Sequence, residues 1–557
     1  MPRRGELAVA FGLLALLGAA VFGVHIAQGG FAWDDWQIAA RVRFPPVSDD
    51  FIGWVDLKVF AFRPLSAIIL GLPAAVFGDV PAWHLAFGLL VSVGTAVALY
   101  AYLRVVVPLA PVHAGAIAAL TLIFPWSDSM VLWPTAALNW LGPAFYFLGT
   151  IAALRGLQAE GRRSRRLAAG ALALFLLSLW SYEIAGPAIV AGLLLYLRVA
   201  PRERALRRWA VDAGVTVAWL VVVGLNTQRA TQDLGGLVAH AGSIADHALT
   251  VAARALVPVA GVPRLAVLAV VAALVAAGHL RARRAADPDA AAALRRWAWL
   301  VPAALAAIAV SYVLVIPAAD RYGPLRPGIE NRINLLAAPA YVTFAYASVL
   351  LAFTLAATAR PAWRRGAAAA AAVAVAAIGA GYVVRVAHDI GSWDDAAAAR
   401  ERILDGLQAA VPDPVPGTTL YAYGASSYQA PGVPIFAVTW DGRSAVRLRY
   451  DDRSLGAFTV RPGRRFVCYP GGVKLNDPSY RRTQGSLYGQ SVLVDVRTRQ
   501  AIPITDVPSC EAANRFLAAA PAPPPLARDA TARHPSAQVR RRPPAPARPY
   551  RPPAPVG

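Results

Sequence analysis

The sequence has little charge and almost no lysine. Only 15% of its 557 residues are charged, and its lysines are Lys58 and Lys474. Hydrophobic residues make up 57% of the chain, which excludes one soluble domain of this length. The apolar residues fall in repeated blocks of helix-spanning length, so the composition predicts an integral membrane protein.

The positive charge is almost entirely arginine, and its position argues against nucleic-acid binding. The formal net charge is +22, but the arginines gather in short clusters between apolar blocks and in the C-terminal tail. Such clusters are typical of the cytoplasmic connections of membrane proteins. We therefore expect no nucleic-acid partner.

An acidic motif, Trp33-Asp34-Asp35-Trp36, follows the first apolar segment, residues 7–29, almost without a spacer. About 23 residues at about 1.5 Å per residue suffice to cross a ~30 Å hydrocarbon core. Two adjacent carboxylates at a membrane surface raise each other's pKa and are costly. The pair is either an acidic cap at a helix end or a catalytic or ligand-binding pair.

Ten further apolar blocks bring the expected number of spanning helices to eleven. These blocks lie at residues 82–103, 109–126, 137–154, 167–180, 184–199, 209–225, 263–280, 298–318, 333–359 and 367–387. Arginine-rich connections around residues 155–166, 198–208, 281–296 and 360–365 alternate with acidic or mixed ones. The positive-inside rule therefore predicts a plasma or inner membrane protein with its N-terminus in the cytoplasm and its C-terminus outside.

This organisation predicts three regions: a transmembrane domain over 1–390, an extracytoplasmic domain over 391–517 and a disordered Pro/Ala/Arg-rich tail over 518–557. Residues 30–80 form a large external loop with interfacial helices, and 226–262 adds another such helix. The soluble domain is α+β or mostly β, with a helix start at Ser392. Its expected strands are 418–423, 434–440, 446–450, 458–460, 465–469 and 491–496.

Both cysteines, Cys468 and Cys510, lie in this polar region, and no metal-ligand spacing such as CxxC occurs. An oxidising exterior permits a disulfide between them, which closes a loop of about 40 residues.

The layout resembles the GT-C fold glycosyltransferases, polytopic enzymes that take sugars from polyprenyl-phosphate carriers. This group contains the protein O-mannosyltransferases and the lipid A aminoarabinose transferases. The matching features are one span followed by Trp33-Asp34-Asp35-Trp36, then Phe62-Arg63-Pro64-Leu65 in the same loop, Trp83-His84-Leu85 at the second span and Ser181-Tyr182-Glu183-Ile184 in an external turn. The resemblance covers roughly residues 1–390 and indicates no particular subfamily.

The resemblance implies a polyprenyl-phosphate-linked sugar as donor, and a glycan, lipid or protein as acceptor. Asp34 is expected to be the general base, with Asp35 as the alternative. Arginine suits the phosphate through its bidentate fork, and the external loop after residue 319 supplies Arg321, Arg326 and Arg332, while Arg63 lies in the first loop. Arg321 and Arg332 could instead merely pair with Asp320 and Glu330 at helix ends. Glu183 could position the acceptor or hold a divalent metal ion, so a metal requirement stays open.

Other classes of protein remain as alternatives. A transporter or flippase would carry ionisable residues near mid-span or broken helices in matching halves, but the charges here lie at the helix ends. A non-catalytic envelope assembly protein would explain the external domain and the tail, but it gives the acidic pair no role. An O-antigen-type ligase is also polytopic with external arginines, but an acidic pair immediately after the first span is not expected of it. The oligomeric state and the acceptor stay open.

Overall fold

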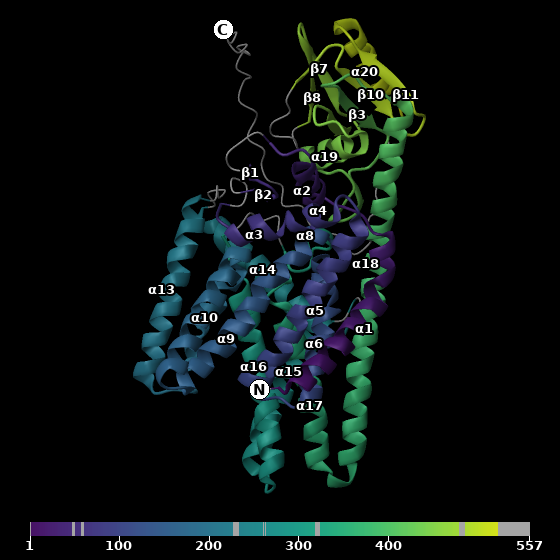
Figure 1. The fold of residues 1–557 in the computed structure, drawn as a ribbon. Coiled ribbons are helices and arrows are strands. Elements are labelled where there is room, and N and C mark those ends of the chain that lie inside the picture. The colour runs from purple at the N-terminus through teal and green to yellow at the C-terminus, as the bar shows by residue number, and fades with distance from the viewer. Residues whose placement is uncertain are drawn as a thin grey trace.

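The computed structural model describes residues 2–46, 51–56, 61–226, 233–259, 261, 263–317, 323–477 and 485–521. It shows a bundle of long helices at one end of which a mixed domain of strands and helices is placed (Figure 1). The helical membrane fold and the small C-terminal α+β region are therefore as the sequence predicts.

Eight helices among the described residues are long and apolar enough to cross a membrane, judged by length and composition. They are α1 (Arg4–Gln28), α5 (Pro81–Val106), the stretch Pro134–Gln158 formed by α8 (Pro134–Ala137), η2 (Leu138–Trp140) and α9 (Leu141–Gln158), α13 (Arg202–Asn226), α15 (Arg264–Arg284), α16 (Pro288–Ser311), α17 (Ala338–Ala359) and α18 (Arg364–Ala410).

Three of the eleven expected spans are not among these eight. The block at 109–126 becomes α6 (Pro111–Leu122), whose 12 residues reach only about 18 Å. The block at 167–180 belongs to α10 (Gly161–Ser181), whose first turns carry arginines. The block at 184–199 is broken into η3 (Glu183–Ala185), α11 (Gly186–Ala191) and α12 (Leu193–Tyr196). Apolar length in the sequence did not reveal the early end of α6 or the breaks within 184–199.

The arginine-rich connections gather at one end of the bundle. In Figure 1 the turns that join α15 to α16 and α17 to α18, the latter with η5 (Pro361–Trp363), lie at the bottom, and the C-terminal sheets lie at the top. The first loop lies at the top as well, with α2 (Asp34–Arg43), β1 (Phe51–Ile52), β2 (Val55–Asp56), α3 (Pro64–Ile69) and α4 (Leu72–Phe77). The charge alternation therefore matches the two ends of the bundle.

Cysteine labelling tests which end is cytoplasmic. Both native cysteines are in a disulfide, so a single engineered thiol gives a clean signal. We expect Arg163→Cys, at an exposed position of α10, to react with a membrane-impermeant maleimide only after the cells are opened. Arg453→Cys in the C-terminal region is the matched control and should react in intact cells. Labelling of residue 163 from outside alone would contradict the predicted orientation.

The last long helix corrects the expected helix start at Ser392. Helix α18 runs without a break for 47 residues, from the bundle into the C-terminal region. Asp394 was expected in the first turn of a new helix. Its Oδ1 is instead hydrogen-bonded to Nδ1 of His25 in α1, at 2.5 Å. A capping sequence within an Ala-rich segment does not stop a helix that already propagates.

The C-terminal region holds a four-stranded sheet in the order β11-β10-β3-β6, in which β3 lies parallel to both β10 and β6. A separate antiparallel sheet has the order β7-β8-β9, and β4 pairs with β5. The strands are β3 (Thr419–Tyr423), β4 (Tyr428–Ala430), β5 (Val433–Pro434), β6 (Gly456–Val460), β7 (Arg465–Tyr469), β8 (Gly472–Asn476), β9 (Ser486–Leu487), β10 (Ser491–Asp495) and β11 (Gln500–Ile504).

The expected strand 446–450 is wrong, because residues 439–450 form helix α19 (Thr439–Tyr450). The expected strand 434–440 is also wrong beyond its first residue, because β5 ends at Pro434 and α19 begins at Thr439. The buried Asp441 explains this local structure. Its carboxylate accepts the backbone N–H of Ala437 at 2.8 Å and that of Gly442 at 2.6 Å, which satisfies donors at the start of the helix. The helix is the crossover between the parallel strands β3 and β6, which such strands require.

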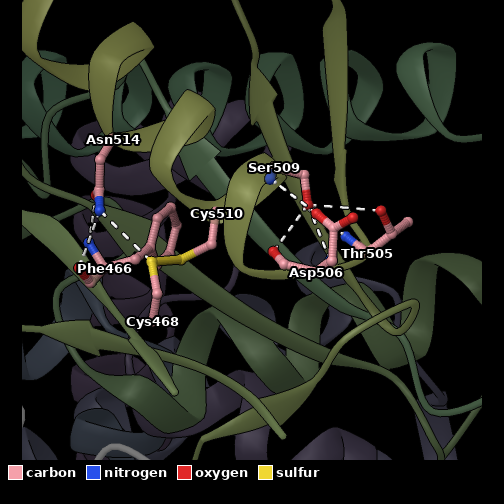
Figure 2. Close-up of a disulfide and its surroundings, with 7 residues drawn as sticks. All are labelled: Phe466, Cys468, Thr505, Asp506, Ser509, Cys510 and Asn514. Carbon is pink, nitrogen blue, oxygen red and sulfur yellow. Dashed lines mark hydrogen bonds between the residues drawn. A yellow bond between two sulfur atoms is a disulfide. The ribbon is translucent and has the colours of Figure 1, made fainter. Parts of the chain in front are cut away.

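The Cys468–Cys510 disulfide is confirmed and joins β7 to α20 (Val507–Ala519). Figure 2 shows Asn514 beside it, which bonds both backbone groups of Phe466: its Oδ1 accepts the N–H at 2.7 Å, and its Nδ2 donates to the carbonyl at 3.1 Å. The last helix is therefore held to the sheet by the disulfide and by the hydrogen bonds of Asn514.

Loss of the disulfide should loosen this helix and leave the bundle intact. The bond joins residues that are 42 apart in the sequence and so closes a loop. A disulfide typically contributes about 2–4 kcal/mol of stabilisation. We expect Cys468→Ser/Cys510→Ser to be inserted normally but cut by protease within α20 faster than wild type. A matched Ser454→Ala change away from the bond should not alter cleavage, and equal cleavage of the double variant would contradict the prediction.

The division at residues 390 and 517 stays a prediction, and most of the expected tail, from residue 522, lies outside the described residues. Residues of both predicted domains share one continuous hydrophobic core, which includes Phe31, Trp36, Leu420 and Phe436. A second, smaller core lies around the disulfide.

Candidate functional site

A cavity of about 300 Å³ lies at the end of the bundle that carries the first loop. It brings together residues that are far apart in the sequence: Asp34 of α2, Arg63 before α3, Glu183 of η3 and Arg332 of η4 (Gly328–Asn334). Apolar and neutral polar side chains complete it, among them Leu70, Trp133, Asn139, Tyr182 and Val315. Four of the seven residues singled out from the sequence therefore share one space.

Asp34 is the carboxylate of the acidic pair that faces this cavity. Burial raises the pKa of Asp34, while the charge of Arg332 and a hydrogen bond from the Trp440 indole act in the opposite direction. Trp440 donates its Nε1–H to Asp34 Oδ1 at 3.1 Å. A carboxylate with a raised pKa, on a cavity wall beside a cation, has the properties of a general base.

Asp35 has a structural role instead. Its side chain is 4% exposed, and its Oδ2 accepts the backbone N–H of Ala32 at 2.8 Å. Its Oδ1 accepts the N–H of Thr135 at 2.8 Å and also the Thr135 hydroxyl. Burial raises the pKa of Asp35 to about 7, against the three donors that favour its charged form. Asp35 therefore joins the start of α2 to α8.

Removing the Asp35 carboxylate should destabilise the fold. Asp35→Ala leaves two buried backbone N–H groups and one hydroxyl without their acceptor, at a cost of about 3 kcal/mol or more. We expect a clear fall in the midpoint of thermal unfolding, measured at pH 8 in detergent. The neighbouring Asp34→Ala, which removes a cavity-facing group, should change that midpoint little. Equal midpoints for Asp35→Ala and wild type would contradict the structural role.

Arg63 and Glu183 form a bidentate ion pair at the cavity wall. Arg63 donates from Nε to Glu183 Oε2 at 2.7 Å and from Nη2 to Oε1 at 2.6 Å. Its guanidinium also lies over the Tyr182 ring, 4.6 Å from the centroid. Burial acts to raise the pKa of Glu183, but the charge and hydrogen bonds of Arg63 outweigh it, and the pKa is lowered. Glu183 is thus a fixed anion that orients Arg63.

Arg332 also lines the cavity, and its guanidinium lies over the Trp133 ring, 5.5 Å from the centroid. The turn that carries it is held by its asparagines: Asn331 donates to Asp128 Oδ1 at 2.5 Å, and Asn334 donates to the Pro324 carbonyl at 2.8 Å. Burial raises the pKa of Asp128 well above its ordinary value. Asp128 thus anchors the turn that presents Arg332.

The other two arginines of the 320–332 loop are not placed in the cavity. Arg326 donates from Nη1 to Glu330 at 3.2 Å, and it is not part of the described lining. Arg321 lies outside the described residues. The geometry thus distinguishes Arg332 from Arg326, which the spacing alone could not do.

Two contributors to the site escaped the sequence reasoning. Asn139 had no signal, since it is one polar residue at the start of an apolar block. Trp440 lies in a segment that was expected to be a strand. Tyr182 belongs to the motif Ser181-Tyr182-Glu183-Ile184 that the sequence analysis singled out, although no role was predicted for it.

The donors of the cavity do not fit a metal ion. Among the described residues, no three His, Cys, Asp or Glu side chains gather as ligands. Both carboxylate oxygens of Glu183 are engaged by Arg63, and the remaining charged groups of the cavity include two arginines. The electrostatics favour an anion in this space instead.

Fold and site together define a polytopic helical protein with a carboxylate–arginine cavity at one end of its bundle. No family model matches the chain, and no curated protein matches its sequence. Among solved structures, the chain is similar to ArnT from Cupriavidus metallidurans bound to undecaprenyl phosphate. The identity is 14%, the match covers 83% of this chain and 87% of that chain, and the TM-score is 0.38.

The same enzyme in the apo state gives 13% identity, 82% and 86% coverage and a TM-score of 0.37. ArnT is a GT-C glycosyltransferase, the class that the first loop resembles. Both TM-scores lie below 0.5, so these similarities by themselves establish no function for this chain.

Proposed function

We propose that this protein is a membrane glycosyltransferase that moves a sugar from a polyprenyl-phosphate carrier to an extracytoplasmic acceptor. The observation that carries the proposal is the shared cavity of Asp34, Arg63 and Arg332. A base and two phosphate-binding cations at the end of a bundle of apolar helices suit a substrate that is half lipid and half phosphosugar.

The reaction needs both kinds of group. The acceptor hydroxyl oxygen attacks the anomeric carbon of the donor, the bond from that carbon to the phosphate oxygen breaks, and the acceptor proton passes to Asp34. Polyprenyl phosphate leaves with the bonding electrons. Arg63 and Arg332 stabilise the negative charge that develops on the phosphate in the transition state.

The other side chains of the cavity position these groups. Glu183 fixes the plane of the Arg63 guanidinium through two hydrogen bonds, so little side-chain entropy is lost when phosphate binds. Asp35 sets the start of α2, and thereby the direction of Asp34. The raised pKa of Asp34 suits a base, since a more basic carboxylate takes a proton more readily.

Lipid analysis of cells tests this function whichever molecule is the acceptor. In cells that express the protein from its own gene, Asp34→Asn should cause a polyprenyl-phosphate-linked sugar to accumulate, detected by mass spectrometry of lipid extracts. Asp79→Asn, an exposed acid of the same loop, is the control and should leave the lipid profile as in wild type. Identical lipid-linked sugars in wild-type, Asp34→Asn and deletion cells would refute the proposal.

A further inference from the structure

The helix that carries Asp34 is covered by a helix of the C-terminal region. Figure 1 shows α19 directly beside α2 at the top of the bundle. The Arg43 guanidinium, at the end of α2, bonds Asp451 at 3.0 Å from Nη2 to Oδ1. The rings of Trp36 and Phe436 lie 6.3 Å apart between centroids. Helix α2 therefore contacts α19 and also the residues that directly flank it, through both polar and aromatic groups.

One contact of this interface reaches the proposed base. Trp440, in the first turn of α19, donates its indole N–H to Asp34 Oδ1 at 3.1 Å. The Trp440 ring also meets the edge of Trp33, with centroids 6.2 Å apart and planes at 71°. Among the described residues, Trp440 is the one side chain that donates a hydrogen bond to the Asp34 carboxylate.

The start of α19 is rigid enough to hold this contact. The buried Asp441 accepts the N–H groups of Ala437 and Gly442. Arg400 of α18, whose side chain is 1% exposed, donates to the Pro434 carbonyl at 2.7 Å and lies close enough to Asp35 and Asp441 to interact with both charges. The segment before Trp440 is thus tied to α18 by the hydrogen bond of Arg400.

We propose that Trp440 is a positioning residue that holds the Asp34 carboxylate in place, so that the C-terminal region completes the site at the end of the bundle. This inference rests on the proposed role of Asp34 as the base. The indole occupies Oδ1 and fixes the rotation of the carboxylate. Oδ2 is then the oxygen that takes the proton of the acceptor hydroxyl.

The indole also tunes the proton affinity of Asp34. A hydrogen bond to the carboxylate favours its charged form and lowers its pKa, against the effect of burial. Six other charged residues lie next to Asp34 in its helix or line the two cavities that Asp34 lines. They are Asp35 of its own helix, Arg63, Glu183 and Arg332 across the larger cavity, and Arg41 and Asp56 in a second cavity of about 120 Å³ that Asp34 also lines.

An infrared titration of the full-length protein in nanodiscs tests the inference. The carbonyl band of protonated Asp34 is assigned by its loss in Asp34→Asn, and its midpoint is followed from pH 4 to 9. We expect Trp440→Phe, which keeps the ring but removes the donor, to move this midpoint upward by about one pH unit. Trp33→Phe alters the neighbouring indole and should leave the midpoint in place.

Trp440→Leu supplies a second variant without a donor and should give the same upward movement. Intact Cys468–Cys510 disulfide and monodisperse elution show that each variant is folded. An unchanged midpoint in both Trp440 variants, or no carboxyl band that depends on Asp34, would overturn the inference. The titration needs no substrate, so it is independent of the lipid analysis. If the midpoint shifts in the Trp440 variants but deletion of the protein leaves lipid-linked sugars unaltered, the proposed glycosyltransferase function is rejected and the contact between Trp440 and Asp34 is retained.

Discussion

Asp34→Asn is expected to reduce sugar transfer by about 10²–10⁴-fold, the usual contribution of a general base. Asn has the shape of Asp and can still accept the Trp440 indole through its Oδ1, so the cavity should keep its form. It cannot take a proton from the acceptor. The loss should therefore appear in kcat, while the affinity for undecaprenyl phosphate should change by less than about threefold.

The pH dependence of transfer provides a second measure of the same group. The active form of Asp34 is the carboxylate, so transfer should rise with pH through the pKa of Asp34. Because burial raises this pKa, activity should be lost on acidification at a higher pH than for an ordinary aspartate. Full activity of both Asp34→Asn and Asp35→Asn would make the pair only an interfacial cap and remove the main support for the proposed function.

Arg332→Ala and Arg63→Ala are expected to weaken undecaprenyl phosphate binding by about 10- to 100-fold each. A hydrogen bond to a charged group contributes about 1.5–3 kcal/mol, and about 1.4 kcal/mol corresponds to a tenfold change. The same contacts act in the ground state and in the transition state, so kcat/KM should fall with the affinity. Binding is measured by native mass spectrometry with added undecaprenyl phosphate.

The matched control is Arg326→Ala. Arg326 belongs to the same loop as Arg332, but it pairs with Glu330, so its loss should leave the affinity unchanged. Arg63→Lys is a further comparison, since lysine keeps the charge but cannot form the bidentate pair with Glu183. An equal loss of affinity in all three alanine variants would show a general charge effect and contradict a defined phosphate site.

The first loop and its acidic pair were predictable from local pattern. A long apolar helix followed at once by Trp33-Asp34-Asp35-Trp36 places the acids at a membrane edge, whatever the remaining fold. The distinction between the two acids was not predictable, because it depends on Thr135, which lies 100 residues further along the chain. Asp35 is the structural residue only because Thr135 meets it.

The spans were predictable where apolar length and helix length agree, as in α5, α13 and α17. They were not predictable where an apolar block is interrupted, as between α11 and α12. The continuous α18 and the helix α19 show a related limit. Ser392 and Asp394 resemble a helix start, and Val446, Leu448 and Tyr450 alternate as in a strand. In α18, Asp394 contacts His25 of another helix, and α19 connects two parallel strands. Neither relation is visible in the local sequence.

The most direct test of the account is a cryo-EM structure of the protein in nanodiscs with undecaprenyl phosphate. The account predicts density for the phosphate in the cavity of Asp34, Arg63 and Arg332, with the prenyl chain leaving along the apolar helices. A phosphate bound at the arginine-rich turns of the opposite end, with the Asp34 cavity empty, would contradict it.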